Sequence, residues 1–212
     1  MIKAVPKDQL VAIYIKGSFV RREMKSGSDV DMVPIVLSDQ YQADVFGVNG
    51  PDLYPVCTVP LSIGELEDNK LHTKFDMPVD LRAKPDRMLK MLEECRLVYG
   101  KPLNPLEFPI RSNEDVYRDE VEVIKNGYIP YFEAEKIDFD PLLKEFFWLV
   151  EGELELKGIK PRHSFAEITK SVKDPNHLIH EAWNLKQQRT KKDELKFVAK
   201  LRAYLIDSRA KS

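Results

Sequence analysis

The sequence has few of the features that mark secreted or membrane-spanning proteins. Only 2 of its 212 residues are cysteine, too few for a disulfide framework or a cysteine-rich metal site, so a reduced setting is expected. The N-terminal stretch has no apolar signal core, and no apolar run approaches the roughly 18 residues that a membrane span needs. A formal net charge of −2 gives no overall attraction to nucleic acid or to an anionic membrane. We therefore expect a cytoplasmic protein with no membrane partner.

The composition that remains is typical of a globular chain. Hydrophobic residues make up 43% and charged residues 32% of the sequence, and a chain of this length can bury a core in one large or two small domains. Pro102, Pro105 and Pro109 are clustered, and the hydrophobic pattern changes around them, which indicates a boundary. The expected domains are residues 1–105 and residues 106–212.

The first domain has the pattern of a β-sheet. Residues 10–15 and 30–37 are short apolar runs with β-branched residues, bounded by glycine or serine. A third run, residues 53–61, contains two prolines, which cannot donate a ladder hydrogen bond, so a bent or edge strand is expected there. Helical periodicity begins near Ala83, and residues 97–100 predict a further short strand and turn. Together these runs predict a mixed sheet with flanking helices.

The second domain is expected to be an all-α bundle. Asp140 can cap a helix whose first position is Pro141, and Gly158 can end it, with an apolar stripe between them. Ser164 and Glu167 resemble a capping box that begins the next helix. Further apolar-periodic stretches follow. The expected fold class is therefore α+β, with a mixed sheet followed by a helical bundle.

A glycine–serine pair follows the first predicted strand. Gly17 lacks a side chain, so the backbone can approach a ligand closely there. The hydroxyl of Ser18 and the N–H groups of a short helix expected over residues 19–25 suit an anionic phosphate. Arg21 lies within the next turn and is expected to add a phosphate contact, the alternative being an exposed helix face.

An acidic pair lies at the mouth of the second predicted strand. Asp29 and Asp31 project to the same side because side chains alternate along a strand, while Val30 packs into the core. Two converging carboxylates repel each other unless a cation lies between them, and Mg²⁺ (or Mn²⁺) bound to triphosphate oxygens is the expected occupant. Ser28, beside the pair, is expected to contribute to nucleotide binding. Such a cation would neutralise charge during attack on the α-phosphorus of a nucleoside triphosphate.

Gly-Ser, ten residues, then Asp-x-Asp between apolar strands resembles the signature of the DNA polymerase β-type nucleotidyltransferase superfamily. The similarity is to its minimal nucleotidyltransferases and its kanamycin- and streptomycin-modifying enzymes, tightly over residues 17–31 and loosely through the first domain. The resemblance implies that Gly17 and Ser18 bind triphosphate and that Asp29 and Asp31 bind Mg²⁺. It also implies transfer of a nucleoside monophosphate, with ATP as the expected donor, to an unidentified hydroxyl acceptor with release of pyrophosphate.

The family pattern includes a third carboxylate on the next strand, and two matchings are open here. The run at residues 53–61 contains no acid. Asp52, just before it, is one candidate for the third metal ligand and catalytic carboxylate. Matching from residues 64–66 instead places Cys57 in that position, and the chain would then bind nucleotide but catalyse poorly. The alternative function is therefore a catalytically weak, nucleotide-binding regulatory or antitoxin-like module.

The second half resembles the HEPN-type helical bundle that often accompanies minimal nucleotidyltransferases, over residues 150–172 and 178–189. Ribonuclease members of that group carry arginine, a short spacer and histidine on a late helix. No histidine follows Arg189, so no such ribonuclease activity is expected. The bundle is expected to bind the acceptor or to form a homodimer surface. Basic residues in the last thirty positions predict a solvated helix face, with an RNA contact as the alternative.

Other residues that could carry chemistry have plainer interpretations. Cys57 and Cys95 are expected to be small core residues. His163 lies near a predicted helix start, where a capping or surface position is expected. His177 and His180 are three residues apart, but with no carboxylate or cysteine set around them they are expected on the surface.

Overall fold

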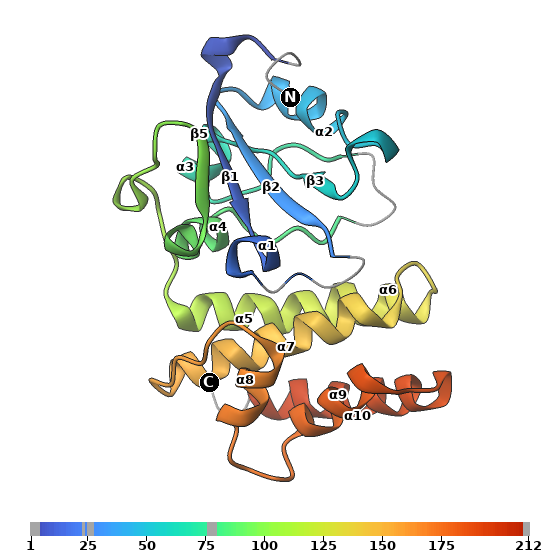
Figure 1. Cartoon of the computed structure of the whole chain (residues 1–212). Helices are drawn as coiled ribbons and strands as arrows, with labels where there is room; N and C mark the ends of the chain where they lie inside the picture. Colours follow the sequence, from blue (N-terminus) through green and yellow to red (C-terminus); the bar gives the residue numbers. More distant parts are fainter. Residues whose placement is uncertain (1–4, 23, 25–27, 76–79, 210–212) are drawn as a thin grey trace. The chain divides into compact units, whose positions relative to one another are not determined.

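The computed structural model of the chain describes residues 5–22, 24, 28–75 and 80–209. The chain divides into two compact units, Met1–Ile110 and Arg111–Ser212. The first contains every strand of the described residues and the second is helical, as Figure 1 shows by following the colours from blue to red. The expected α+β class is confirmed.

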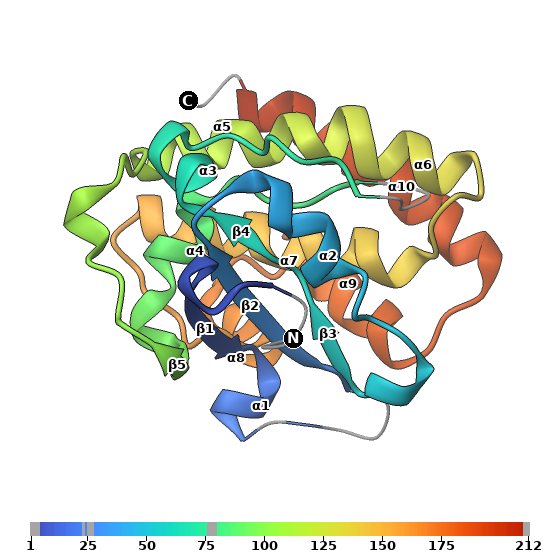
Figure 2. The ribbon, with the colours of Figure 1, turned by 90° about the horizontal axis from the view of Figure 1, so that it is seen from above.

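The first unit is built on a mixed sheet. β1 (Leu10–Lys16) and β2 (Val30–Val36) pair antiparallel, and β5 (Arg96–Gly100) pairs antiparallel with the other edge of β1. β3 (Val56–Thr58) and β4 (Leu61–Ser62) both pair parallel with the free edge of β2. Figure 2 shows β1 and β2 side by side, with β3 beyond β2 and β5 beyond β1. The two central strands, β1 and β2, are formed by the apolar runs at residues 10–15 and 30–37 that the sequence predicts as strands.

The run at residues 53–61 forms two edge strands, which confirms the expectation of a bent or edge strand. Pro60 separates them because it has no N–H to donate to β2. Just before it, the N–H of Val59 donates to the carbonyl oxygen of Met32 at 3.0 Å. The chain therefore crosses the edge of β2 with one interruption and continues into the next helix.

Short helices connect the strands of the first unit. They are η1 (Lys7–Gln9), α1 (Ser18–Arg21), η2 (Asp39–Tyr41), α2 (Gln42–Phe46), η3 (Pro51–Leu53), α3 (Ile63–Asp68), α4 (Asp86–Lys90), η4 (Leu92–Glu94) and η5 (Pro105–Glu107). The helix expected over residues 19–25 ends earlier, at Arg21, because Arg22 adopts a left-handed conformation with φ 58°. Residues 23 and 25–27 lie outside the described residues.

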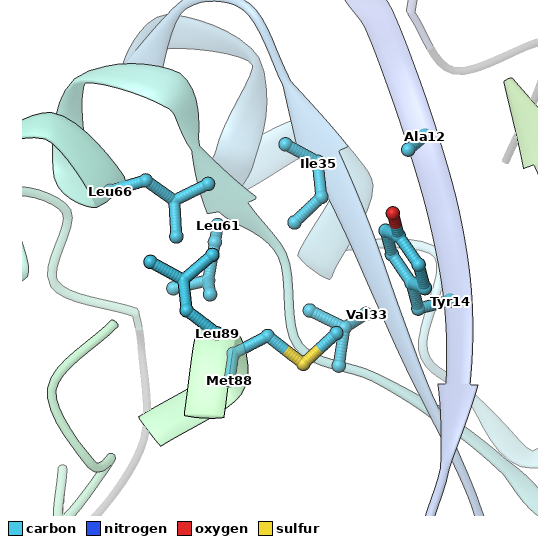
Figure 3. Packing of buried hydrophobic residues seen from close by; sticks show 8 residues of the cluster. All are labelled: Ala12, Tyr14, Val33, Ile35, Leu61, Leu66, Met88 and Leu89. Carbon is cyan, nitrogen blue, oxygen red and sulfur yellow. The ribbon is translucent and has the colours of Figure 1, made fainter. Parts of the chain in front are cut away.

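The two faces of the sheet pack against different helices. The cluster drawn in Figure 3 comprises Ala12, Tyr14, Val33, Ile35, Leu61, Leu66, Met88 and Leu89. The cluster on the opposite face comprises Val5, Leu10, Ile13, Val36 and Val45. Because Leu66 belongs to α3, Met88 and Leu89 to α4, and Val45 to α2, α3 and α4 cover one face and α2 covers the other.

A fully buried carboxylate joins α3 to two neighbouring segments. Glu65 completes a capping box with Ser62 at the start of α3. It also accepts a hydrogen bond from Gln42 Nε2 at 2.6 Å, and others from the backbone N–H groups of His72 at 2.8 Å and Thr73 at 3.3 Å. These donors replace water around the charge, which is the condition under which a buried carboxylate is tolerated.

The second unit confirms the helical expectation for this half of the chain. Its elements are α5 (Asn113–Val123), the π-helical turn η6 (Ile124–Tyr128), α6 (Ile129–Glu133), α7 (Phe139–Leu156), α8 (Phe165–Ser171), α9 (Leu178–Gln187) and α10 (Lys191–Arg209). The apolar stripe of α7 is buried and contacts α5, α8 and α9. Within the described part of the chain, no helix is long and apolar enough to cross a membrane.

The sequence predicted the C-terminal end of α7 correctly but not its N-terminal end. Gly158 adopts φ +74° just after the helix, as expected for its termination. The expectation that Asp140 caps the helix was wrong, because α7 begins at Phe139 with Asp138 in the N-cap position. Asp140 Oδ2 instead lies 2.8 Å from the guanidinium of Arg189. The carboxylate of Asp140 is therefore engaged in a long-range ion pair and not in a helix cap.

A polar cluster joins three helices of the second unit. Tyr204 donates a hydrogen bond to the carboxylate of Glu153, and His177 Nε2 lies 3.0 Å from the tyrosine oxygen. His177 Nδ1 accepts from the N–H of Ile179 at 3.1 Å, which leaves the ring proton on Nε2. The nearby His177, whose Nε2 lies 3.9 Å from Glu153 Oε2, and then hydrogen bonds from Lys157 and Tyr204 lower the pKa of Glu153 to about 2. The surface position expected for His177 was wrong, since its side chain is 14% exposed and caps α9.

We predict that Glu65→Ala destabilises the first unit by at least about 3 kcal/mol, because several buried N–H donors lose their acceptor. Urea unfolding followed by circular dichroism measures the effect. Glu67→Ala, on the exposed side of the same helix, is the matched control and should change stability by less than about 0.5 kcal/mol. Equal unfolding curves for the two variants would show that the buried carboxylate contributes nothing.

We predict that Glu153 makes stability depend on pH in the acid range. Its folded pKa of about 2 lies below its ordinary value of 4.5, so its contribution is complete above about pH 4.5 and is lost as the pH falls towards 2. The stability difference between the wild type and Glu153→Gln should therefore be largest at neutral pH, up to about 3 kcal/mol, and shrink on acidification. Urea midpoints at pH 7, 4.5 and 3 measure it, with exposed Glu114→Gln as control. A difference independent of pH would contradict the prediction.

Candidate functional site

Three neighbouring strands place three polar residues in a row at one end of the sheet. Lys16 in β1 pairs with Asp31 in β2, and Asp31 pairs with Cys57 in β3. Directly paired residues project to the same face of a sheet, so the ammonium, carboxylate and thiol share one side. Val33, two residues further along β2, belongs to the cluster in Figure 3. The row therefore continues that hydrophobic face to its polar end.

The electrostatics of Cys57 show that both acids of the Asp-x-Asp pair act at this end of the sheet. Burial, and then the negative charges of Asp31 and Asp29, raise the pKa of the Cys57 thiol, while the positive charge of Lys16 opposes them. The thiol is half-buried, and with a raised pKa it stays protonated at neutral pH. The site thus combines two carboxylates, one ammonium and one neutral thiol.

Gly17 packs directly against the carboxylate of Asp31. Its backbone has φ 79° and ψ −156°, a combination that is open essentially only to glycine. A Cβ at this position would lie 2.7 Å from Asp31 Oδ2. The turn after β1 and the acid of β2 are therefore in contact only because this residue has no side chain.

The other predicted phosphate-contacting residues lie close to this contact along the chain. α1 begins at Ser18, and the backbone N–H of Arg21 donates to the carbonyl oxygen of Gly17 at 3.3 Å. The side chains of Ser18 and Arg21 are half-buried. The side chain of Ser28, just before the acidic pair, is half-buried as well. Their assignment to phosphate or nucleotide binding remains a prediction from the sequence.

Of the two matchings for the third carboxylate, the strand register favours Cys57. Asp52 lies in η3, before β3, and its side chain is exposed. The described residues contain no group of three or more His, Cys, Asp or Glu side chains arranged to hold a metal ion. Asp52 is therefore not gathered with Asp29 and Asp31 into a three-carboxylate cluster, and its metal-binding and catalytic roles remain untested predictions.

The donor set fits a cation that takes two ligands from the protein. Asp29 and Asp31 supply the hard oxygen donors that Mg²⁺ prefers, whereas the protonated thiol of Cys57 is a poor ligand for it. Mg²⁺ is commonly held by one or two carboxylates and completes its octahedron with water and substrate phosphates. Gly17 packs against the Asp31 carboxylate, so the turn after β1 lies directly beside this donor set. The residues fit a metal–nucleotide complex better than an all-protein cage.

The sequence pattern did not single out Lys16 as a site residue. Locally it only ends an apolar run before Gly17, which predicts a strand end. Its place beside Asp31 follows from the antiparallel register of β1 and β2, which joins residues fifteen positions apart. Counting outward along the expected hairpin from the motif would have identified it.

An open polar cavity of about 340 Å³ lies in the second unit, not at the acidic pair. Its charged lining is largely engaged in ion pairs. Arg189 lies 2.8 Å from Asp140 and 3.0 Å from Glu194. This pairing explains the cavity as a feature of the helical packing, and we assign it no ligand.

No protein-family model matches the chain, and no curated protein matches it. A solved structure that does match is spectinomycin adenyltransferase AAD(9) from Enterococcus faecialis, crystallised with ATP and spectinomycin. It is 14% identical, with 96% of this chain and 86% of that chain covered and a TM-score of 0.48. Similarity at this level carries no functional argument.

We predict that Gly17→Ala destabilises the first unit by about 1–3 kcal/mol, because alanine is strained at this φ and its methyl group meets the Asp31 carboxylate. Thermal unfolding followed by circular dichroism measures the loss. Gly50→Ala is the matched control, because its backbone is extended and a Cβ there meets no atom within 4 Å. It should be neutral or slightly stabilising. Equal effects in the two variants would mean that the contact imposes no constraint.

Proposed function

We propose that the protein transfers a nucleoside monophosphate from a nucleoside triphosphate, with ATP as the expected donor, to a hydroxyl acceptor. Mg²⁺ (or Mn²⁺) is the proposed metal, and pyrophosphate is the second product. The observation that carries the proposal is the packing of Gly17 against Asp31, at the end of the sheet where the charge of Asp29 also acts. The turn proposed to bind phosphate therefore lies directly beside a carboxylate proposed to bind the cation.

The proposed reaction is an in-line displacement at phosphorus. An oxygen lone pair of the acceptor forms a bond to the α-phosphorus, and the bond from that phosphorus to the bridging oxygen breaks. Pyrophosphate leaves with the bonding electrons, and the hydroxyl proton passes to a base or to water. When bound, a divalent cation supplies charge neutralisation at the phosphate oxygens.

The chain's own residues hold the reacting groups in this scheme. Asp29 and Asp31 bind the cation at the end of β2, and the turn at Gly17 and Ser18 binds the polyphosphate. Arg21, one turn later, adds a charge-assisted contact to a phosphate oxygen. In this scheme the residues accelerate the reaction by positioning, because they hold the triphosphate and the cation together before the acceptor arrives.

We predict that Asp29→Asn with Asp31→Asn lowers pyrophosphate release by at least about 1,000-fold, because the amides keep the shape but remove the charge that holds the cation. The assay combines ATP, Mg²⁺ and a panel of hydroxyl acceptors. Asp44→Asn, an exposed acid of α2, is the control and should retain full activity. Asp52→Asn in the same assay decides whether that residue takes part. Undiminished turnover by the double variant would overturn the proposal.

Cys57 favours a second candidate function. A protonated thiol occupies the sheet position next to Asp31, where a third acid would otherwise complete the metal site. Such a protein can bind nucleotide as a regulatory or antitoxin-like module with little turnover. Calorimetry showing tight Mg·ATP binding without pyrophosphate release would support this function, whereas rapid release would exclude it.

A further inference from the structure

The row formed by Lys16, Asp31 and Cys57 carries an unusual balance of charge for a metal site. Asp29 and Asp31 contribute two formal negative charges, and Lys16 contributes one formal positive charge. Adding these gives −1. One divalent cation more than neutralises these three side chains, so a second would be repelled by Lys16 and by the first cation.

Lys16 is placed to act on a ligand. It is half-buried at the end of β1, and among the described residues it has no ion-pair partner within 4.0 Å. Lys16 pairs with Asp31 across β1 and β2, and Asp31 pairs with Cys57 across β2 and β3, so the three side chains share one face of the sheet. The ammonium therefore acts on the thiol-bearing face of the sheet, next to Asp31.

A half-buried ammonium without an anionic partner is an incomplete interaction. The carboxylate opposite it, Asp31, belongs to the proposed cation site, and the turn proposed to bind polyphosphate begins at Gly17, which packs against that carboxylate. A phosphate oxygen of the ligand is the simplest anionic partner for Lys16. A lysine ammonium binds phosphate as a point charge. Lys16 would then neutralise polyphosphate charge that a second cation would otherwise neutralise.

Resting on the proposed nucleotide-binding function, we propose that the site holds one divalent cation and that Lys16 binds the substrate polyphosphate in place of a second. The substrate class is a nucleoside polyphosphate delivered with a single cation. Lys16 acts here as a binding residue, so its contribution should appear in nucleotide affinity and metal stoichiometry.

The test measures bound Mn²⁺ by electron paramagnetic resonance in the presence of a non-hydrolysable ATP analogue. The wild type should bind one Mn²⁺ per chain at saturating analogue. Lys16→Met should weaken analogue binding about tenfold at fixed Mn²⁺, the loss expected for one charge-assisted contact. Lys16→Arg should restore the affinity to within about threefold of wild type.

Lys101→Met is the matched control, since this exposed lysine lies by the opposite end of β1, its N–H bonded to the carbonyl oxygen of Val11. It should bind the analogue like the wild type. Two Mn²⁺ per wild-type chain, or unweakened binding by Lys16→Met, would overturn the inference. The Mn²⁺ count in the wild type needs no variant, so it decides even if Lys16→Met fails to fold.

The outcomes separate this inference from the proposed function. One Mn²⁺ and a Lys16-dependent affinity without pyrophosphate release would uphold the inference and defeat the transferase activity. Pyrophosphate release with two Mn²⁺ per chain would support the transferase activity and overturn the inference. A wild type that binds no analogue would overturn both.

Discussion

The contact between Gly17 and the carboxylate of Asp31 is the constraint on which the first unit's functional end depends. The antiparallel register of β1 and β2 sets Lys16 opposite Asp31, so the following residue turns beside the acid. A side chain there would push the carboxylate away. The hydrophobic cluster of Figure 3 maintains that register, because a one-residue slip would turn Val33 out of the core and Asp31 to the other face.

Carboxylates of the first unit lie in two different kinds of surroundings. Glu65 is fully buried and surrounded by hydrogen-bond donors that fix α3 and the segment after it. Asp29 is exposed, Asp31 is half-buried, and both raise the pKa of the same thiol. Burial with complete hydrogen bonding stabilises a fold, whereas two acids whose charges act on the same thiol near solvent suit the cation site proposed above.

Sequence reasoning succeeded where a local pattern decides the structure and failed where distant residues decide it. The apolar runs of β1, β2 and α7 were recognisable because burial of one face imposes their period. Asp140 was wrongly assigned to a helix cap because Arg189, far along the chain, takes its carboxylate. His177 looked like a surface residue because Tyr204 lies on another helix. Motif spacing put Gly17 and Asp31 in one site, and the structure brings them into contact, but the spacing did not single out Lys16, which strand pairing sets opposite Asp31. The ligand roles of these residues stay predictions.

Those neighbours matter for the proposed cation site because they change its net charge. With Lys16 on one side and a neutral thiol on the other, the pair attracts a free divalent cation less strongly than three carboxylates would. A phosphate chain adds negative charge and further oxygen ligands. Cation and nucleotide would therefore each strengthen the binding of the other, and by linkage the gain is reciprocal. A site of this charge would hold little metal at rest and acquire its cation together with the nucleotide.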